Sequence, residues 1–370
     1  VLTGATGFIG GAVARRLAAE GVAVHALTRP GADRTRLAGR PIVFHDGDFT
    51  DPAGLTGLFD GATWVIHAAG MLGRAGVSEA EYRRVNAEGA RAFLTAAAEA
   101  YRAGRTAADL RVLHVSTAGV LGARMKDEGG KMKAEGGRMK DEGGRMKAEG
   151  GRMKAEGGRM KDDPSSFILQ PSSFETLSPS NAYERSKAQA EGYAAALAAA
   201  GLPLVVARPE FIYGPGDRHV LGLFRAIQRG QFFYIGDGNN TCHPTYVDDL
   251  VDGLLACLRA GAPGGVYTIA GPRTLTFREL AETIAAELGV RPPRWRVPRR
   301  LAWLGAAALE GVGRLTGRAV PLSRDGVAFF SESRGSSIAR ARAELGYAPR
   351  VDLREGVART VAWYRGEGLL

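Results

Sequence analysis

The chain of 370 residues has little cysteine, with Cys242 and Cys257 as its only two. Two cysteines cannot build the disulfide framework that stabilises many small secreted proteins, and so low a number fits a reducing compartment. We therefore expect a cytoplasmic location. The chain opens on Val1 without a methionine and already inside a strand-like stretch, which indicates that the natural chain starts earlier.

Long apolar runs are also missing. No stretch approaches the roughly 18 consecutive apolar residues of a membrane-spanning helix. The most apolar region, Leu301 to Leu315, is interrupted by Glu310 and Arg314. The sequence therefore predicts no clear membrane segment, and it predicts that 301–315 forms a helix packed on the body of the protein.

Lysine is almost absent outside one segment. Seven of the eight lysines lie between Arg124 and Asp163, and the rest of the chain holds 36 arginines and a single lysine, Lys187. The formal net charge is +10, of which the 12 basic and 9 acidic residues of 124–163 supply +3. The other basic residues are scattered and form no dense stripe, so we expect no nucleic-acid partner.

A seven-residue repeat occupies that segment. It starts as Arg-Met-Lys-Asp-Glu-Gly-Gly at Arg124 and recurs in near copies to Asp163, followed by a tail in which Pro-Ser-Ser-Phe appears twice. A coiled coil needs two apolar positions in each heptad, whereas each unit here has one methionine and a helix-weakening Gly-Gly pair. The segment cannot bury enough surface to fold alone, so 124–174 is predicted to be a disordered low-complexity insertion.

Without the insertion, short apolar runs alternate with helical stretches. This alternation predicts an α/β fold with a parallel sheet covered by helices on both faces. After about Pro209 the pattern loosens into what we interpret as a smaller lobe, which would include Val247–Arg259, Thr276–Leu288 and Leu353–Tyr364. The expected strands are 22–27, 41–45, 63–67, 111–116 and 202–207, and the expected helices are 8–19, 79–102 and 181–200. The expected division is a dinucleotide-binding domain in two parts, 1–123 and 175–215, the insertion 124–174, and a mainly substrate-binding lobe, 216–370, with some segments returning to the first domain.

The first loop has the glycine spacing of a dinucleotide site. Gly4, Gly7 and Gly10 stand in Thr3-Gly4-Ala5-Thr6-Gly7-Phe8-Ile9-Gly10 between a predicted strand and a predicted helix. Glycines there permit a tight turn and a close approach of backbone N–H groups to a pyrophosphate, beside the positive end of the helix. The expected cofactor-binding residues of this loop are Gly4, Thr6, Gly7, Phe8, Ile9 and Gly10.

The ends of the next strands would hold the rest of the cofactor. Arg29 follows the second strand, where NAD-preferring sites have an acidic residue, so the sequence favours NADP over NAD. Asp48 and Phe49 follow the third strand, where the Asp48 carboxylate could reach the adenine amino group. Small residues end the fourth strand where the cofactor ribose could lie close to the backbone, and they are Ala68, Ala69 and Gly70.

Tyr183 and Lys187 are the predicted catalytic pair. They stand four residues apart and share one face of a helix. A free phenol is a poor base at neutral pH, whereas a nearby ammonium favours the phenolate and should lower the pKa of Tyr183. Tyr183 would then move a proton to or from the substrate oxygen while Lys187 holds the nicotinamide ribose. Because Lys187 is the lysine that an arginine-rich chain retains, we interpret it as a functional residue.

A hydroxyl to orient the substrate oxygen is expected nearby. Ser116 and Thr117 end the fifth predicted strand, in Val115-Ser116-Thr117-Ala118-Gly119-Val120-Leu121-Gly122. Either hydroxyl could take this role. No metal site is expected.

In combination, these motifs resemble the extended (atypical) short-chain dehydrogenases/reductases, in the branches of the NAD-dependent epimerases/dehydratases and of the 3β-hydroxysteroid dehydrogenases. The resemblance also rests on Asn86 and on the run from Arg208 to Gly216, and it covers the chain outside 124–174. It implies a Rossmann-type doubly wound sheet. It further implies that Thr117 is the family's hydroxyl position, that Asn86 lies near the active site, and that Pro209 and Ile212 lie beside the nicotinamide.

The chain departs from the nucleotide-sugar enzymes of that family at Cys242. Those enzymes have an arginine suited to a substrate diphosphate five positions before the valine of Tyr-Val-Asp-Asp, here Val247, and a neutral thiol cannot do this. The stretch from His243 to Val247 instead resembles the 3β-hydroxysteroid dehydrogenase and dihydroflavonol-reductase branches.

The leading hypothesis is therefore an NAD(P)-dependent oxidoreductase for a hydroxyl or keto carbon of a bulky, largely apolar small molecule, such as a sterol, terpenoid or flavonol. One alternative is a nucleotide-sugar epimerase or dehydratase with retained NAD, and another is a non-catalytic dinucleotide sensor. The resemblance also implies a homodimer through the helices 79–102 and 181–200.

Overall fold

A computed structural model describes residues 1–73, 76–122, 125–126, 132–133, 177–316 and 322–370. The predicted insertion lies outside the described residues except for two short strands. These are β6 (Met125–Lys126) and β7 (Met132–Lys133), which pair antiparallel.

A parallel sheet is the centre of the molecule. Its strand order is β13-β8-β5-β4-β1-β2-β3, and every pair within it is parallel. The order runs outward in both directions from β1, which is the arrangement of a doubly wound α/β fold. The predicted fold class is thus confirmed. The strands are β1 (Leu2–Thr3), β2 (Val24–Thr28), β3 (Ile42–Asp46), β4 (Trp64–His67), β5 (Arg111–Val115), β8 (Leu204–Pro209) and β13 (Val266–Ile269).

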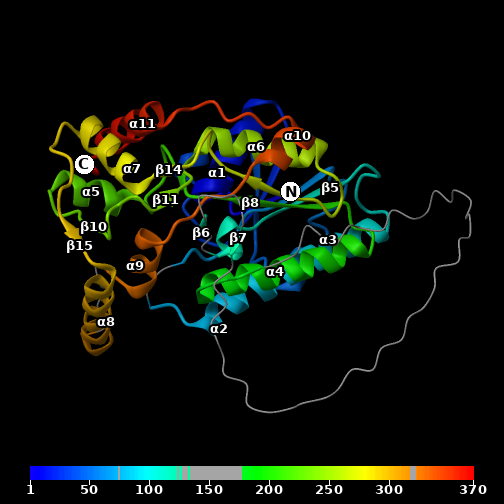
Figure 1. Cartoon of the computed structure of the whole chain (residues 1–370). Coiled ribbons are helices and arrows are strands. Elements are labelled where there is room, and N and C mark those ends of the chain that lie inside the picture. Colours follow the sequence, from blue (N-terminus) through cyan, green and yellow to red (C-terminus); the bar gives the residue numbers. More distant parts are fainter. Residues whose placement is uncertain (74–75, 123–124, 127–131, 134–176, 317–321) are drawn as a thin grey trace, which may run out of the picture.

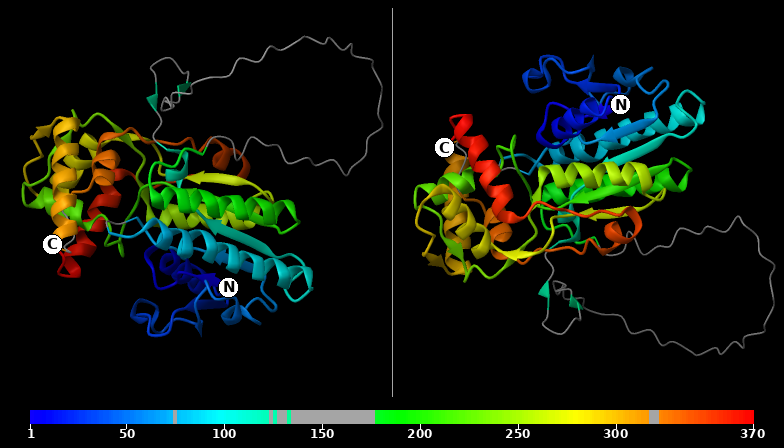
Figure 2. Two further views of the ribbon diagram at one scale, coloured as in Figure 1. Left: turned by 90° about the horizontal axis from the view of Figure 1, so that it is seen from below. Right: turned by 90° about the horizontal axis from the view of Figure 1, so that it is seen from above.

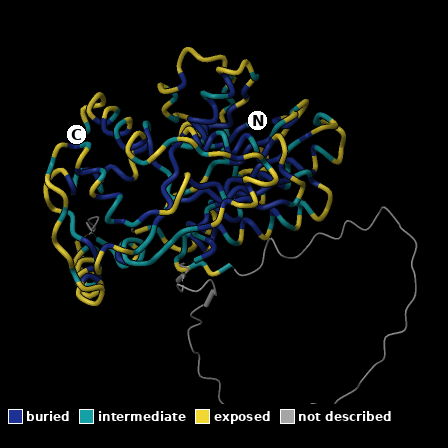
Figure 3. The backbone as a smooth tube through the Cα atoms, turned by 45° about the horizontal axis from the view of Figure 1, so that its top comes forward, coloured by how far each residue is buried: buried dark blue, intermediate teal, exposed yellow. Residues whose placement is uncertain are grey.

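Helices cover both faces of the sheet (Figures 1 and 2). On one face α1 (Phe8–Ala19) packs beside α6 (Val247–Ala260), and α10 (Ala339–Leu345) contacts α6 and β13. On the other face α3 (Gly89–Arg102) packs beside α4 (Ala182–Ala199). Figure 3 shows the buried residues concentrated in the interior of the molecule and the exposed ones at its periphery. Helix α6, which the sequence pattern placed with the smaller lobe, carries nine buried residues and packs against the sheet.

The segment before α3 is helical but not uniformly α-helical. It begins as α2 (Glu79–Tyr82), continues as a π-helix, η3 (Arg83–Glu88), and becomes α3 at Gly89. Short 3-10 turns also occur at η1 (Thr35–Leu37), η2 (Pro52–Leu55) and η4 (Ala118–Leu121). A π-turn widens the helix locally, and such turns often accompany functional residues.

A smaller group of elements lies at one end of the sheet, on the side of the C-terminus (Figure 2). Here α7 (Phe277–Leu288) packs against α5 (Leu221–Gln228) and α11 (Leu353–Gly366). Two-residue strands pair around them: β9 (Ile212–Tyr213) with β12 (Thr245–Tyr246), β10 (Tyr234–Ile235) with β15 (Arg296–Val297), and β11 (Thr241–Cys242) with β14 (Leu275–Thr276).

The apolar region after Pro298 forms the predicted helix, α8 (Arg299–Thr316), followed by α9 (Arg324–Ser331). Only one side of α8 packs, through Ala302 and Ala306 against Val327 of α9. The predicted packing on the body is limited to this side, since Leu301 and Leu304 are 60% and 59% exposed. None of the helices in the described ranges has the length and apolar character needed to cross a membrane.

Candidate functional site

The glycine loop joins β1 to α1 in a very tight turn. Gly7 N donates to Gly4 O at 2.9 Å, and Gly4 has φ +76°, a conformation that favours glycine. A Cβ on Gly10 would lie 2.2 Å from Gly4 O, so α1 can approach the turn this closely only with glycine there. The loop presents the N-terminus of α1, which begins at Phe8, as the predicted pyrophosphate site requires.

The end of β4 lies directly against this loop. A Cβ on Gly4 would be within 3 Å of backbone atoms of Ala68 and Ala69. The Thr3 hydroxyl accepts from Ala69 N at 3.2 Å and is hydrogen-bonded to Nδ1 of the buried His67 at 2.9 Å. The predicted ribose-contacting residues are therefore brought beside the glycine loop.

Tyr183 and Thr117 meet at the carboxyl end of the sheet. Thr117 follows β5, Tyr183 lies in the first turn of α4, and the Thr117 side chain lies close enough to the phenol to act on its pKa. Asn181 caps α4 by accepting from Glu184 N at 2.9 Å, which fixes the start of the helix and hence the position of Tyr183. The Tyr183 ring lies against Gly73, where a Cβ would be 3.5 Å from it.

Lys187 reaches the same place from one turn further along α4. Its ammonium is buried and donates to Val115 O at 2.7 Å, and Gly70 lies close enough that a Cβ there would be 3.8 Å from Nζ. Among the described residues the ammonium makes no other hydrogen bond. Since an ammonium has three donors, two are left for a ligand, which fits the ribose hydroxyls of a nicotinamide dinucleotide.

Burial dominates the protonation of the pair. It raises the pKa of Tyr183 to about 12, against the smaller lowering effect of the Thr117 hydrogen bond. It lowers the pKa of Lys187 to about 8, and Glu191 partly offsets this. We expected the ammonium to lower the tyrosine pKa, and in the protein alone the reverse shift is found. Removing each group from water disfavours its charged form, and this is the largest effect on each pKa.

Ser116 lies beside Thr117 and is buried. Its backbone N donates to Ala207 O at 2.8 Å, whereas its hydroxyl oxygen has no hydrogen-bond partner among the described residues. Buried hydroxyls without partners are uncommon in folded proteins and are often functional. Thr117, by contrast, also accepts from Gly119 N at 3.2 Å.

Asn86 holds the segment between β4 and α2 in place from within the π-helix. It accepts from Met71 N at 2.7 Å and donates to Met71 O at 2.9 Å and to Ser186 Oγ at 3.1 Å. Ser186 in turn donates to the carbonyl of Tyr183 at 2.7 Å. Asn86 is therefore connected to the tyrosine helix rather than to the predicted pyrophosphate loop.

The residues predicted for the adenosine end are less closely organised. The Arg29 side chain is exposed and has no hydrogen bond or ion pair among the described residues, whereas Arg34 bonds to Thr28 Oγ1 at 2.7 Å and pairs with Asp46. Asp48 accepts from Thr50 N at 2.9 Å and from its hydroxyl at 2.8 Å.

Phe49 and Ile212 also lie near the ends of strands. Phe49 meets the ring of His67 edge-on, with 5.2 Å between centroids. Pro209 ends β8 and Ile212 begins β9, with the strained Phe211 between them at φ 34°. Positive φ is rare for a phenylalanine, and such strain tends to occur at functional positions. The Phe211 ring contacts Phe277 and Phe329, with centroids 6.3 and 5.6 Å away.

An ion pair that our reading of the sequence missed joins the small lobe to the tyrosine helix. Arg334, between α9 and α10, donates to Glu184 Oε1 at 2.9 Å, and both side chains are largely buried. The other Glu184 oxygen accepts from the N and the hydroxyl of Ser180, at 2.8 and 2.6 Å. No local signal marks this pair, because 150 residues separate its members.

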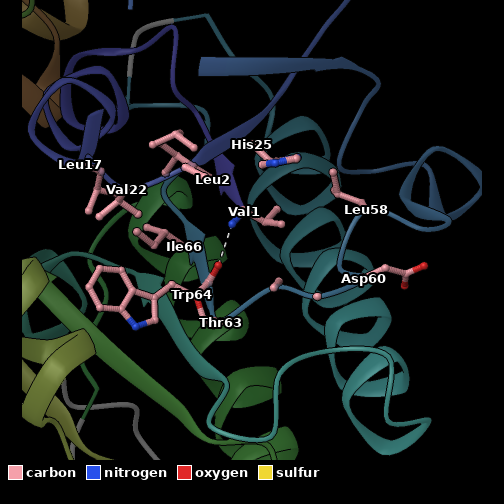
Figure 4. Close-up of a pocket in the computed structure, with 14 residues that line it drawn as sticks. Val1, Leu2, Leu17, Val22, His25, Leu58, Asp60, Thr63, Trp64 and Ile66 are labelled. Atoms are coloured by element: carbon pink, nitrogen blue, oxygen red, sulfur yellow. Dashed lines mark hydrogen bonds between the residues drawn. The ribbon is translucent and has the colours of Figure 1, made fainter. Parts of the chain in front are cut away.

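A cavity elsewhere lies at the end of the sheet opposite to the predicted site (Figure 4). It is lined by residues at the amino ends of β1, β2 and β4, including Val1, His25 and Trp64, and Val1 N donates to Trp64 O at 2.7 Å. None of the predicted catalytic residues lines this cavity.

Comparison with known families decides the identity of the chain. The family model described as "NAD dependent epimerase/dehydratase family" matches residues 1–140 and 158–270. The chain belongs to this family. Membership in the NAD-dependent epimerase/dehydratase family agrees with the parallel sheet, the glycine loop and the tyrosine–lysine pair, and it confirms the resemblance to the extended short-chain dehydrogenases/reductases.

Curated relatives of this family member include sterol enzymes and a sugar enzyme. The sterol-4-alpha-carboxylate 3-dehydrogenase of Schizosaccharomyces pombe is 32% identical over 193 residues, which are 50% of this chain and 56% of that protein. A 3beta-hydroxysteroid-dehydrogenase/decarboxylase of Arabidopsis thaliana is 32% identical over 194 residues, which are 48% of this chain and 44% of that protein. A dTDP-glucose 4,6-dehydratase of Actinoplanes is 31% identical over 200 residues, covering 51% and 52%. The chain spans about half the length of the curated relatives it matches.

Solved structures share the fold over nearly the whole chain. The dTDP-glucose 4,6-dehydratase of Streptomyces venezuelae, solved with NAD bound, has a TM-score of 0.68 at 24% identity, covering 100% of this chain and 98% of the other. The UDP-glucuronic acid 4-epimerase of Bacillus cereus, also solved with NAD, has a TM-score of 0.65 at 18% identity, covering 99% and 98%. At these identities the likeness establishes the fold.

Proposed function

We propose that this family member is an NAD(P)-dependent dehydrogenase or reductase that acts on a hydroxyl or keto carbon of a bulky, largely apolar small molecule. The observation that carries the proposal is the juxtaposition of three groups. The Thr117 side chain lies close enough to the Tyr183 hydroxyl to lower its pKa, and the buried Lys187 ammonium lies one helical turn away. This arrangement can hold a substrate oxygen and move its proton while a neighbouring carbon exchanges hydride.

The nicotinamide cofactor would supply the hydride acceptor or donor. The chain's own residues bind and orient the reactants. The backbone of the Gly4–Gly10 loop binds the pyrophosphate, Lys187 holds the ribose hydroxyls, and Thr117 and Ser116 hold the substrate oxygen. Tyr183 gives a proton to this oxygen in reduction and takes one from it in oxidation.

The proton direction follows from the tyrosine pKa. With a pKa of about 12 in the protein alone, Tyr183 is protonated at neutral pH and ready to donate. Oxidation of an alcohol requires the phenol to lose its proton first. We therefore expect the oxidation rate to rise with pH and the reduction rate to fall, and initial rates in both directions across pH would test this.

Aromatic side chains on the lobe side support an apolar substrate. Phe211 follows β8 at the site and packs with Phe277 and Phe329, while the buried Cys242 occupies the place of the diphosphate-binding arginine. The buried arginine of this region, Arg334, is already paired with Glu184. The sterol dehydrogenases among the relatives support the same substrate class.

For the cofactor, we propose a preference for NADP. Arg29 is exposed at the end of β2 and has no acidic partner among the described residues, so its guanidinium is available to a 2′-phosphate. Replacing Arg29 with serine should raise the KM for NADPH severalfold and leave the KM for NADH unchanged. Equal effects on both cofactors would contradict the preference.

The alternative is a nucleotide-sugar epimerase or dehydratase with retained NAD, favoured by the identity to a dTDP-glucose 4,6-dehydratase. Such an enzyme should purify with NAD bound and gain thermal stability from UDP- or dTDP-sugars. An enzyme for an apolar substrate should purify without bound NAD and should gain no thermal stability from these sugars.

The decisive experiment follows nicotinamide absorbance with a panel of sterol, terpenoid and flavonol alcohols and ketones. For the best substrate, Tyr183→Phe should lower kcat by at least about a hundredfold. Tyr193→Phe is the matched control, because Tyr193 is on the same helix but bonds to Glu88. Full turnover by Tyr183→Phe would overturn the mechanism.

A further inference from the structure

Helix α8 extends away from the rest of the molecule (Figure 1). Its packing is chiefly with α9, and its small residues Ala302 and Ala306 form the buried side. Beyond this side, Arg299, Trp303 and Glu310 contact residues of α9 or the residue after it, and the face that carries Leu301 and Leu304 is exposed.

Large apolar side chains lie on those exposed sides. Leu301, Leu304 and Val312 are 60%, 59% and 56% exposed, and their spacing places them on one face of the helix. Leu309 borders this face and is also exposed, whereas Trp303 is exposed on the side toward α9, where the Arg324 guanidinium lies over its ring at 5.6 Å. Most of the exposed large apolar side chains of the described chain are here, and Trp295, just before the helix, is 75% exposed. Clustering of this kind marks an interaction surface, since single exposed leucines are ordinary.

Basic residues accompany the apolar face. The segment 291–300 contains no acidic residue, and its five arginines are all exposed. Arg299 pairs with Glu332, whereas the others have no ion pair within the described chain. The acidic residue of α8, Glu310, is engaged by Arg324. The unpaired arginines are Arg291, Arg294, Arg296 and Arg300.

We propose that α8 and the preceding arginine segment form a docking surface for an anionic lipid bilayer, with the helix lying in the headgroup region. An exposed face of leucine and valine, preceded by an exposed tryptophan and several arginines, is the composition of interfacial helices. Leucine side chains would enter the acyl boundary while the guanidinium groups contact lipid phosphates, to which they bind strongly.

Charge argues against two other occupants. A second copy of the chain, packed face to face, would bring two arginine segments together, and the repulsion between their charges would weaken the contact. The segment 124–163 carries net positive charge, with 12 basic and 9 acidic residues, so it is not attracted to the arginines either. An anionic bilayer offers acyl chains to the exposed leucines and phosphate groups to the arginines.

The position of α8 also connects the bilayer to the aromatic side of the lobe. Ala302 and Ala306 belong to the same cluster as Val327, and two residues further along α9 Phe329 packs against Phe211. A lipid surface at α8 therefore lies one helix away from the site. The docking proposal does not depend on the proposed reaction.

The test measures sedimentation of the full chain with vesicles of phosphatidylcholine alone and with a third of phosphatidylglycerol. Binding should require phosphatidylglycerol and weaken at high salt. The double variant Leu301→Glu/Leu304→Glu should lower the partition coefficient at least about tenfold, and so should neutralising Arg294, Arg296 and Arg300 with glutamine.

The matched control is Val43→Glu, because Val43 on β3 is 51% exposed but far from α8 in sequence and lies in the main sheet. This variant should bind vesicles like the parent chain. Circular dichroism and NADPH binding show whether each variant is folded. Absence of binding to either vesicle, or equal loss in Val43→Glu, overturns the proposal. So does a dimer that dissociates in Leu301→Glu/Leu304→Glu without any vesicle binding, since a second copy then covers the helix.

Discussion

At the scale of single residues, Lys187 shows how burial and charge oppose each other. Its pKa falls from 10.5 to about 8 on folding, so between these values the unfolded chain holds more protons than the folded protein. Stability contributed by this residue therefore rises with pH through this window. The full shift corresponds to about 3 kcal/mol.

The corresponding prediction concerns Lys187→Met. Between about pH 7 and about pH 10, the free energy of unfolding of the parent chain should rise by roughly 1–3 kcal/mol relative to that of the variant. Urea unfolding of both proteins at several pH values measures this difference. The variant also loses the hydrogen bond to Val115 O, which changes its free energy of unfolding by the same amount at every pH. A difference between the two proteins that does not vary with pH would therefore contradict the prediction.

The Ser116 hydroxyl can be tested separately for a contribution to stability and for a contribution to catalysis. Because its buried oxygen has no partner in the described protein, Ser116→Ala should change the free energy of unfolding by less than about 0.5 kcal/mol. If it holds the substrate oxygen, the same variant should lower kcat/KM about tenfold or more. A destabilised variant with normal kinetics would assign Ser116 a structural role instead.

Glycine positions of the site can be tested against a glycine outside it. Gly10→Ala should abolish cofactor binding or unfold the protein, since its Cβ would lie 2.2 Å from a backbone oxygen. Gly192→Ala, in α4 with nothing within 4 Å, should instead stabilise the protein by up to about 1 kcal/mol. Fluorescence titration with NADPH and thermal unfolding distinguish the two. Normal NADPH affinity in Gly10→Ala would refute the assigned loop.

At the scale of elements, the small lobe and the catalytic helix are tied together by Arg334 and Glu184. Arg334→Met should destabilise the protein by about 2–4 kcal/mol, because the buried Glu184 carboxylate loses its cation. Since Glu184 follows Tyr183 directly, we also expect kcat to fall more than KM rises.

Two further variants separate positioning from general damage. Arg334→Lys keeps the charge and should restore part of kcat. Arg354→Met removes an exposed partner of Glu287 and should lower the free energy of unfolding by less than about 1 kcal/mol. If Arg334→Met and Arg334→Lys have the same kcat as the parent, the ion pair does not position the tyrosine.

At the scale of the whole molecule, the chain leaves and re-enters the core at one place around the repeat. Ser178 N donates to Val120 O at 2.9 Å, and a Cβ on Gly122 would meet Ser178 O. Removing 124–174 would leave four residues, 123 and 175–177, between Gly122 and Ser178. Shortening the closed loop favours folding by about 2 kcal/mol. We therefore expect the deletion variant to fold with an equal or higher Tm in calorimetry, and a loss of cooperative unfolding would contradict this.

Oligomerisation and the division into domains stay predictions. Figure 1 shows α3 and α4 side by side on an outer face of the sheet, as the expected four-helix contact requires. Light scattering of the parent and deletion proteins would show whether a homodimer forms and whether the repeat obstructs it.

Local features were predicted well because local physics determines them. The helix 8–19 follows from the glycine loop and its apolar spacing, and the structure has it with the same bounds. The strand ends at Val115 and His67 fell within a residue of the prediction, because buried parallel strands are short apolar runs.

What the sequence determined by itself is the doubly wound fold and the candidates for its site, since the glycine spacing, the strand–helix alternation and the lone Lys187 are local patterns. Only the tertiary structure decided which distant groups meet. It packed α6 on the sheet, paired Arg334 with Glu184, buried Lys187 and partly buried Tyr183 so that desolvation is the largest effect on both pKa values, and left one face of α8 exposed. These outcomes depend on burial and on contacts across many residues, which no local pattern encodes.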